Sequence, residues 1–122
     1  MLTHVKFVNL PVDDLERALA FYTDRIGLKL KWREKEPDGW DFVELGMDGA
    51  QTRIVLVRRT SDGPDQEPAL HFIDTDLRQS VERWRQAGVE IVVEPHPAPW
   101  DENTVLCRLR DSEGNILLVE TH

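Results

Sequence analysis

An internal repeat at an offset of 62 residues is the feature that most constrains the fold of this chain. Asp14-Leu15 begins one amphipathic segment, and Asp76-Leu77 begins a second one 62 positions later. The same offset superimposes a later apolar run, residues 54–57, on residues 116–119. A helix-like and a strand-like segment that share one offset indicate two copies of one supersecondary unit. A duplicated unit commonly builds its ligand site between the copies, so any site residue can be compared with its counterpart in the other copy.

Length and composition favour an ordinary soluble domain. The chain has 122 residues, of which 40% are hydrophobic and 31% are charged, and this is enough to bury a core. No apolar stretch approaches the roughly 20 residues needed to span a bilayer. The first residues lack a signal-peptide pattern, so a cytoplasmic location is expected. We expect one domain over residues 1–122, with module one at 3–59, a polar linker at 60–67 and module two at 68–121.

The formal net charge of −8 at pH 7 limits the classes of partner. Nucleic-acid binding requires Lys and Arg side chains that replace phosphate counterions, so it is not expected. The acidic balance serves solubility or attracts cationic small molecules. Cys107 is the single cysteine and lies in an apolar run. A buried, inert thiol is therefore favoured over a nucleophile, and no disulfide is expected.

The order of segments predicts a βαβββ unit in the first half. Asp14 is a suitable N-cap, apolar residues follow it at helical spacing, and Gly27 is placed to end the helix. Pro11 is expected to stop the first strand. The strands expected around this helix cover residues 5–10, 28–33, 42–45 and 53–57.

The second half repeats this order. A helix is expected at 76–87, with Gly88 as its cap, and the prolines between residues 95 and 99 are expected to form a stiff connection. The expected strands cover residues 70–73, 91–93, 105–109 and 116–119. Each half has one helix, which can cover only one side of a sheet. The predicted fold is α+β, with two tandem βαβββ modules whose sheets curve around a cleft and whose helices lie on the outer face.

Strand parity separates the two faces of each sheet. One set is wholly apolar and is expected under the helices: Val8, Leu10, Val55, Val57, Leu70, Phe72, Leu117 and Val119. The other set is apolar with a few polar groups, and no helix remains to cover it: Phe7, Asn9, Ile54, Leu56, Arg58, Ala69, His71, Ile116, Leu118 and Glu120. An uncovered apolar face with sparse polar groups suits a small-molecule cleft, and a dimer interface is the alternative.

Five stretches resemble a known group of proteins. They are residues 10–30, 49–57, 74–91, 99–100 and 110–120, and together they touch nearly the whole chain. In order and content they resemble the vicinal-oxygen-chelate superfamily, which includes glyoxalase I, bleomycin-resistance proteins and extradiol dioxygenases. The resemblance implies a divalent metal held by one side chain from each of four strands, which acts as a Lewis acid on two adjacent substrate oxygens.

The same resemblance places the four ligand positions on Phe7, Leu56, Ala69 and Leu118. The offset of 62 relates Phe7 to Ala69 and Leu56 to Leu118, so the ligand positions assigned in the two modules are consistent with each other. All four side chains are apolar and cannot bind a metal. The usual metal is therefore not expected, and no cofactor is predicted.

The polar residues nearest to these positions are His71 and Glu120, whose counterparts at the same offset are Asn9 and Arg58. We expect the four to form the polar part of an apolar cleft. One alternative is a relocated divalent metal at His71 and Glu120. Another is purely structural, with an ion pair between Arg58 and Glu120 and a hydrogen bond between His71 and Asn9.

Two further residues are candidates outside this group. Glu44 shares strand parity with Trp40 and Phe42, and a carboxylate beside aromatic rings can act as a general base; a solvated position at a strand edge is the alternative. Trp100 follows a proline-rich segment and suits a ligand-stacking platform or, equally, a packing lid.

Three functions are compatible with these patterns. The first is a metal-independent protein that binds an apolar or aromatic ligand, which can be cationic, through Phe7, Asn9, Leu56, Arg58, Ala69, His71, Trp100, Leu118 and Glu120. The second is a lyase- or dioxygenase-type enzyme that uses Glu44, His71 or Glu120 as acid or base, with a relocated metal or none. The third is a non-catalytic module whose open face forms a homodimer.

Overall fold

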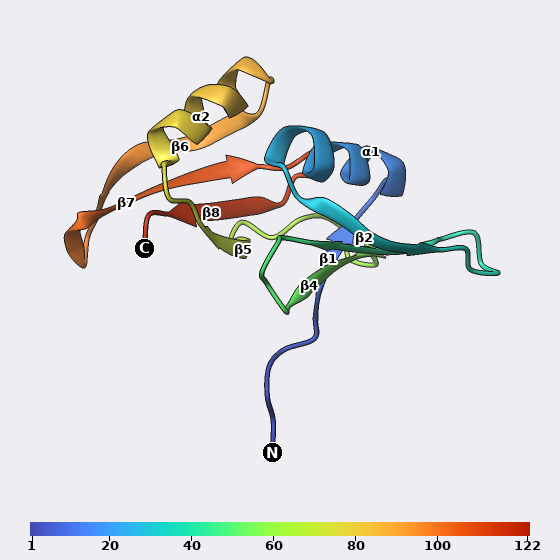
Figure 1. Ribbon diagram of the computed structural model, residues 1–122. Coiled ribbons are helices and arrows are strands. Elements are labelled where there is room, and N and C mark those ends of the chain that lie inside the picture. The colour runs from blue at the N-terminus through green and yellow to red at the C-terminus, as the bar shows by residue number, and fades with distance from the viewer. The chain divides into compact units, whose positions relative to one another are not determined.

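The computed structural model describes residues 1–122 and divides the chain into two compact units, Met1–Asp62 and Gly63–His122. We call them module one and module two. Each contains a four-stranded mixed sheet and a helical segment between its first two strands (Figure 1). The predicted α+β class and the repeated βαβββ order are confirmed. None of the helical segments has the length and the apolar character that a bilayer span requires. The grouping of both modules into one domain stays a prediction.

Module one has the sheet order β1-β4-β3-β2, with β1 parallel to β4 and the other neighbours antiparallel. Its elements are β1 (Phe7–Val12), α1 (Leu15–Ala20), the π-helical segment η1 (Phe21–Ile26), β2 (Lys29–Glu34), β3 (Phe42–Gly46) and β4 (Arg53–Arg58).

Module two repeats this topology in the order β5-β8-β7-β6, again with one parallel pair, β5 and β8. Its elements are β5 (Pro68–Ile73), α2 (Leu77–Gln86), β6 (Glu90–Ala98), β7 (Asp101–Arg110) and β8 (Ile116–Glu120).

The helix ends follow the capping residues in the sequence. The Asp14 carboxylate accepts a hydrogen bond from the Arg17 backbone N–H at 3.0 Å, and Asp76 does the same for Gln79 at 3.5 Å. These bonds satisfy backbone donors that the first helical turn leaves open. Gly27 ends the first helical segment with φ of 98°, a conformation that glycine adopts without steric cost. The helical spacing of the apolar residues does not predict the change from α1 to the wider η1.

Two of the expected strand ends are wrong because the strands continue through proline, and β7 begins at Asp101, four residues before its expected start. β1 runs through Pro11, and β6 runs through Pro95 and Pro97. Both are edge strands of their sheets, so the side of the strand without an N–H donor can face outward. The pairing of β6 with β7 is interrupted by three register shifts, which accommodate the prolines in an irregular strand.

The register of β4 corrects the predicted faces of module one. Leu56 pairs with Leu10, and Val55 pairs with Asn9. Paired residues of neighbouring strands point to the same face, so Leu56 shares the face of Leu10 rather than that of Asn9. In module two, Leu118 pairs with His71, which is the counterpart of Asn9. The structural counterpart of Leu118 is therefore Val55, at an offset of 63, because one residue is inserted between the helix and the fourth strand of module two.

The cores lie on the faces that contain the most deeply buried side chains. In module one α1 packs against β4, and Leu10, Leu45 and Leu56 are at most 1% exposed. In module two the predicted faces are confirmed, because Leu70 pairs with Leu117 and Phe72 with Val119 on one side of the sheet. Each module thus buries one helix-covered apolar face.

A buried polar turn joins β7 to β8. Asp111 is 6% exposed and accepts hydrogen bonds from the backbone N–H groups of Glu113 and Asn115 at 2.8 and 2.7 Å, and from the Asn115 side-chain amide at 3.0 Å. The D-x-x-G-N pattern of this turn is therefore a hydrogen-bonded connection whose carboxylate replaces backbone partners.

Replacement of Asp111 by alanine should destabilise the protein by ~3 kcal/mol, because several buried donors would lose their acceptor. The matched control is Asp65→Ala, which removes an exposed carboxylate and should change the free energy of unfolding by less than ~0.5 kcal/mol. Urea unfolding followed by circular dichroism measures both. Equal stability of the two variants would contradict a structural role for the turn.

Candidate functional site

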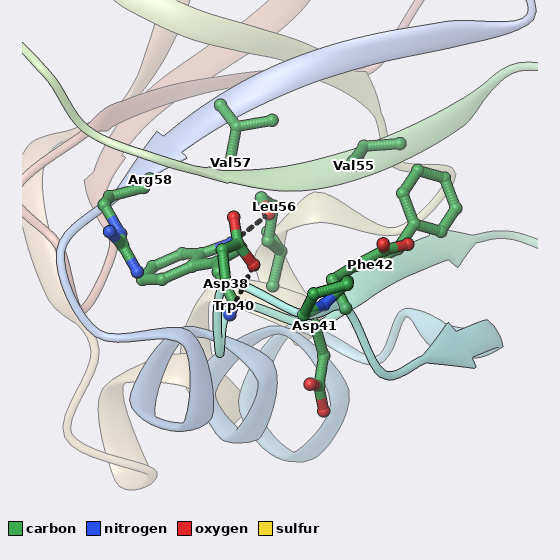
Figure 2. A pocket seen from close by; sticks show the side chains of 10 residues that line it. Asp38, Trp40, Asp41, Phe42, Val55, Leu56, Val57 and Arg58 are labelled. Atoms are coloured by element: carbon green, nitrogen blue, oxygen red, sulfur yellow. Dashed lines mark hydrogen bonds between the residues drawn. The ribbon is translucent and has the colours of Figure 1, made fainter.

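The candidate site is a pocket of about 540 Å³ in module one. It lies where the segment before β3 passes the second half of β4 (Figure 2). The lining residues are Glu36, Pro37, Asp38, Trp40, Asp41, Phe42, Val55, Leu56, Val57 and Arg58.

The pocket exists because β3 and β4 pair over only a short length. Their register contains two pairs, Leu45 with Ile54 and Glu44 with Val55. At the next residue of β4, the Leu56 carbonyl accepts a hydrogen bond from the Trp40 indole Nε1–H at 3.0 Å. The Trp40 side chain thus supplies the hydrogen-bond donor at the point where backbone pairing stops. The chain before β3 diverges from β4 there and leaves a gap beside it. Figure 2 shows the indole under β4, with this bond dashed.

Trp40 is also held through its backbone. The Asp38 carboxylate accepts a hydrogen bond from the Trp40 N–H at 2.9 Å, which closes the turn after Pro37. The side chain and the main chain of Trp40 are therefore both fixed. A fixed, half-buried indole at a pocket wall offers a flat apolar surface with little entropy left to lose on binding.

Arg58 lies over this indole. Its Cζ atom is 5.0 Å from the Trp40 ring centroid, a cation–π contact. The guanidinium makes no hydrogen bond or ion pair within the chain. Figure 2 shows its nitrogen atoms beside the indole at one end of the pocket. The wall therefore presents a planar cation whose N–H groups are available.

The acidic residues that line the pocket differ in whether an arginine of the protein pairs with them. Arg33 donates to the Asp41 carboxylate at 3.0 Å and also pairs with Glu16, and these two carboxylates raise the pKa of Arg33. In Figure 2 the Asp41 carboxylate points away from Trp40. Glu36 and Asp38 are exposed, and so is Arg58.

The predicted site residues of module one fall into two groups. Phe7 packs edge-to-face on Phe42, with ring centroids 5.8 Å apart. Glu44 pairs with Arg53 at 3.4 Å, so the carboxylate is held at the sheet surface rather than left solvated. Asn9 is exposed. These residues share the face of Val55, whereas Leu56 and Arg58 belong to the opposite parity.

In module two the predicted residues lie around the β5–β8 pair. His71 is exposed and pairs with Leu118, which is buried. Glu120 is half-buried and pairs with Ile73. Ala69 is exposed at a register shift between Pro68 and Leu70. The sheet thus places His71, Leu118 and Glu120 on one face, as parity predicted.

Two other candidates lie elsewhere in module two. Trp100 sits in the β6–β7 turn with 66% of its surface exposed. Cys107 is fully buried in β7, and burial raises the pKa of its thiol to about 11. A thiol held neutral in a core is not a nucleophile at physiological pH.

The residues do not fit the metal that the resemblance implies. Phe7, Ala69 and Leu118 offer no donor atom, and neither Leu56 nor its structural replacement Val55 does. Neither module brings together three or more His, Cys, Asp or Glu side chains that could hold an ion.

Sequence reasoning missed the contact between Trp40 and Arg58. The two residues are 18 positions apart, and the contact requires β3 to diverge from β4. One signal was available: Pro37-Asp38-Gly39 places a turn before Trp40, so that an aromatic residue enters the sheet from a loop.

Substitution of Trp40 by phenylalanine should cost ~1 kcal/mol in the free energy of unfolding, because the ring is kept and the hydrogen bond to Leu56 is lost. Trp32→Phe is the matched control, since Trp32 is 56% exposed, and should cost less than ~0.5 kcal/mol. Chemical denaturation compares them. A loss no larger for Trp40→Phe than for Trp32→Phe would show that the indole bond does not hold the segment.

Comparisons with known proteins agree with this architecture. The chain is 25% identical to the Bacillus subtilis (strain 168) protein YetH over 122 residues, 98% of this chain and 99% of that one. It is similar to TnmS3, an antibiotic binding protein from Streptomyces sp. CB03234, with a TM-score of 0.81, 24% identity and coverage of 97% and 94%. It is also similar to an E144Q glyoxalase I mutant from Zea mays, with a TM-score of 0.81, 22% identity and coverage of 97% of this chain and 45% of that one.

The family model for the Glyoxalase/Bleomycin resistance protein/Dioxygenase superfamily matches residues 2–119. This span includes both βαβββ modules and nearly all of the chain. The protein therefore belongs to the glyoxalase/bleomycin resistance/dioxygenase superfamily.

Proposed function

We propose that this protein binds an apolar or aromatic small molecule, without the usual metal, and that Trp40 is its main contact surface. The supporting observation is the fixed indole at the wall of a pocket of about 540 Å³. This volume lies within the range of small-molecule sites, which combine an apolar lining with a few placed polar groups.

The lining suits such a ligand. Trp40, Phe42 and Val57 are half-buried, so each retains surface that a ligand can cover. Removing apolar surface from water contributes about 25 cal/mol per Å². Burial of one face of a two-ring aromatic molecule would therefore contribute to the binding free energy. The fixed indole limits the conformational entropy that is lost on binding.

The family supports a binding role without requiring it. TnmS3 is described as an antibiotic binding protein, and the positions that would hold a metal are apolar in this chain. Both points favour sequestration of a small molecule over metal-dependent catalysis. Contacts from Asn9, His71 and Trp100 stay predictions, as do the homodimer and the cytoplasmic location.

The neutral probe 2-naphthamide should bind to the protein with micromolar to millimolar affinity, as is typical of fragment-sized ligands. Trp40→Ala should weaken binding at least about tenfold, because the stacking surface is removed. Isothermal titration calorimetry gives the affinity, and ¹H–¹⁵N NMR shifts show which residues respond.

Trp32→Ala is the matched control for this experiment, because it removes an exposed tryptophan of module one that does not line the pocket. The proposal predicts unchanged affinity for this variant. Loss of binding in Trp100→Ala but not in Trp40→Ala would show that the ligand stacks on Trp100 in the β6–β7 turn instead. No measurable binding of the probe would overturn the proposed function.

An enzyme of the lyase or dioxygenase type is the second candidate. His71 and Glu120 share one face of module two, and a relocated metal there would have one nitrogen and one carboxylate ligand. Glu44 is less suited to act as a base, because Arg53 already occupies its carboxylate.

Calorimetric titration with Zn²⁺, Ni²⁺, Mn²⁺ and Fe²⁺ separates the two candidates. The binding-protein proposal predicts no tight stoichiometric site, since two ligands are fewer than the three or four protein ligands of stable sites. A one-to-one metal that His71→Ala removes would favour the enzyme. His96→Ala is the control for nonspecific binding by an imidazole.

A further inference from the structure

We infer that the pocket selects an aromatic ligand that carries an anionic group, such as a carboxylate, and that Arg58 is the residue that recognises this charge. The inference rests on the proposed function and adds the chemical class of the ligand. It also differs from what the net charge of the whole chain suggests, which is attraction for a cation.

The aromatic surface of the pocket already carries a cation of the protein. A cationic ligand would be expected to lie over the face of an electron-rich ring. The protein already places a cation of its own there, because the Arg58 Cζ atom is 5.0 Å from the Trp40 centroid. A second cation at this surface would be repelled by the guanidinium or would have to displace it.

The Arg58 guanidinium has N–H groups that no other residue of the protein engages. Three other arginines of module one are paired, Arg33 with Asp41, Arg53 with Glu44 and Arg59 with Asp13, whereas Arg25 is unpaired but lies outside the pocket lining. The Arg58 guanidinium has no such partner, although it lines the pocket. Stacking on an indole leaves its planar N–H edge open, and that edge matches the two oxygens of a carboxylate.

Three carboxylates line the pocket and would attract a cation. Asp41 is neutralised by Arg33 and points away from Trp40 (Figure 2). Asp38 accepts the backbone N–H of Trp40. Asp38 and Glu36 line the pocket and are exposed, as Arg58 is, but the charged group that lies over the Trp40 ring is Arg58. The charged group that lies against the aromatic wall is therefore the arginine.

Together these contacts define a mode of binding. The ring of the ligand covers apolar surface along Trp40 and the neighbouring lining, and its anionic group accepts two hydrogen bonds from the Arg58 edge. Arg58 remains on the indole, so that ring and charge are recognised by two residues that already support each other.

Three probes with one ring test the inference: 2-naphthoate, 2-naphthamide and 2-(aminomethyl)naphthalene, which are anionic, neutral and cationic at pH 7.5. We expect 2-naphthoate to bind at least about tenfold more tightly than the amine, with the amide between them. The preference should decrease with added salt. Calorimetry measures the affinities, and the Arg58 Nε–H signal in NMR reports contact with the carboxylate.

Arg58→Gln should abolish the preference for 2-naphthoate, so that 2-naphthoate and 2-naphthamide bind within about threefold of each other. Arg58→Lys keeps the charge but loses the planar edge, and should retain only part of the preference. Arg25→Gln is the matched control, because it removes an exposed arginine outside the lining and changes the net charge equally. It should leave the order of the three probes unchanged.

Each other outcome contradicts the inference in its own way. If the amine binds most tightly, and more so in Arg58→Gln, then Arg58 occupies the place of a cationic ligand. If 2-naphthoate and 2-naphthamide bind equally, the pocket is aromatic but not selective for charge, and the proposed function stands alone. If Arg58→Gln still prefers 2-naphthoate, another residue recognises the anion. If no probe binds, the proposed function fails and this inference with it.

Discussion

The hydrogen bond from the Trp40 indole to the Leu56 carbonyl is the interaction on which the candidate site depends. A carbonyl on a strand needs a partner, and in a longer sheet a backbone N–H of β3 would supply one. Here the partner is a side chain, so β3 leaves β4 without an unsatisfied acceptor. The same bond fixes the indole plane, and the plane in turn supports the Arg58 guanidinium. The pocket, the fixed indole and the position of the Arg58 guanidinium thus all follow from the point at which β3 stops pairing with β4.

The fold was predictable because its signals are local and occur twice. Asp14 and Asp76 cap the helices at the same offset, and the structure confirms both caps. The face of β4 was not predictable from the same offset. Its apolar run is continuous, so a shift of one residue leaves the sequence match almost unchanged, yet it turns every side chain to the other face. Only the pairing of Val55 with Asn9 settles the register.

The site shows the same division between local and non-local information. The apolar nature of Phe7, Ala69 and Leu118 is read directly from the sequence, and it holds at the fourth position whichever register applies, because Val55 and Leu56 are both aliphatic. The role of Trp40 depends on a contact with β4 at a point where the pairing between β3 and β4 has ended. Hydrophobic periodicity cannot predict such a contact, since Trp40 lies outside any regular element.

The net charge of the protein favours a cationic ligand, whereas the charge of Arg58 in the pocket favours an anionic one. The distance from each charge to the bound ligand decides which effect is larger. The excess of carboxylates spreads over the surface of the protein, where salt screens charges beyond roughly 10 Å. A ligand inside the pocket interacts mainly with groups at contact distance. Among these, Asp41 is neutralised by Arg33, whereas Arg58 lies on the indole without a partner. The long-range field can favour the approach of cations, while the contact groups favour an anion once the ring is seated.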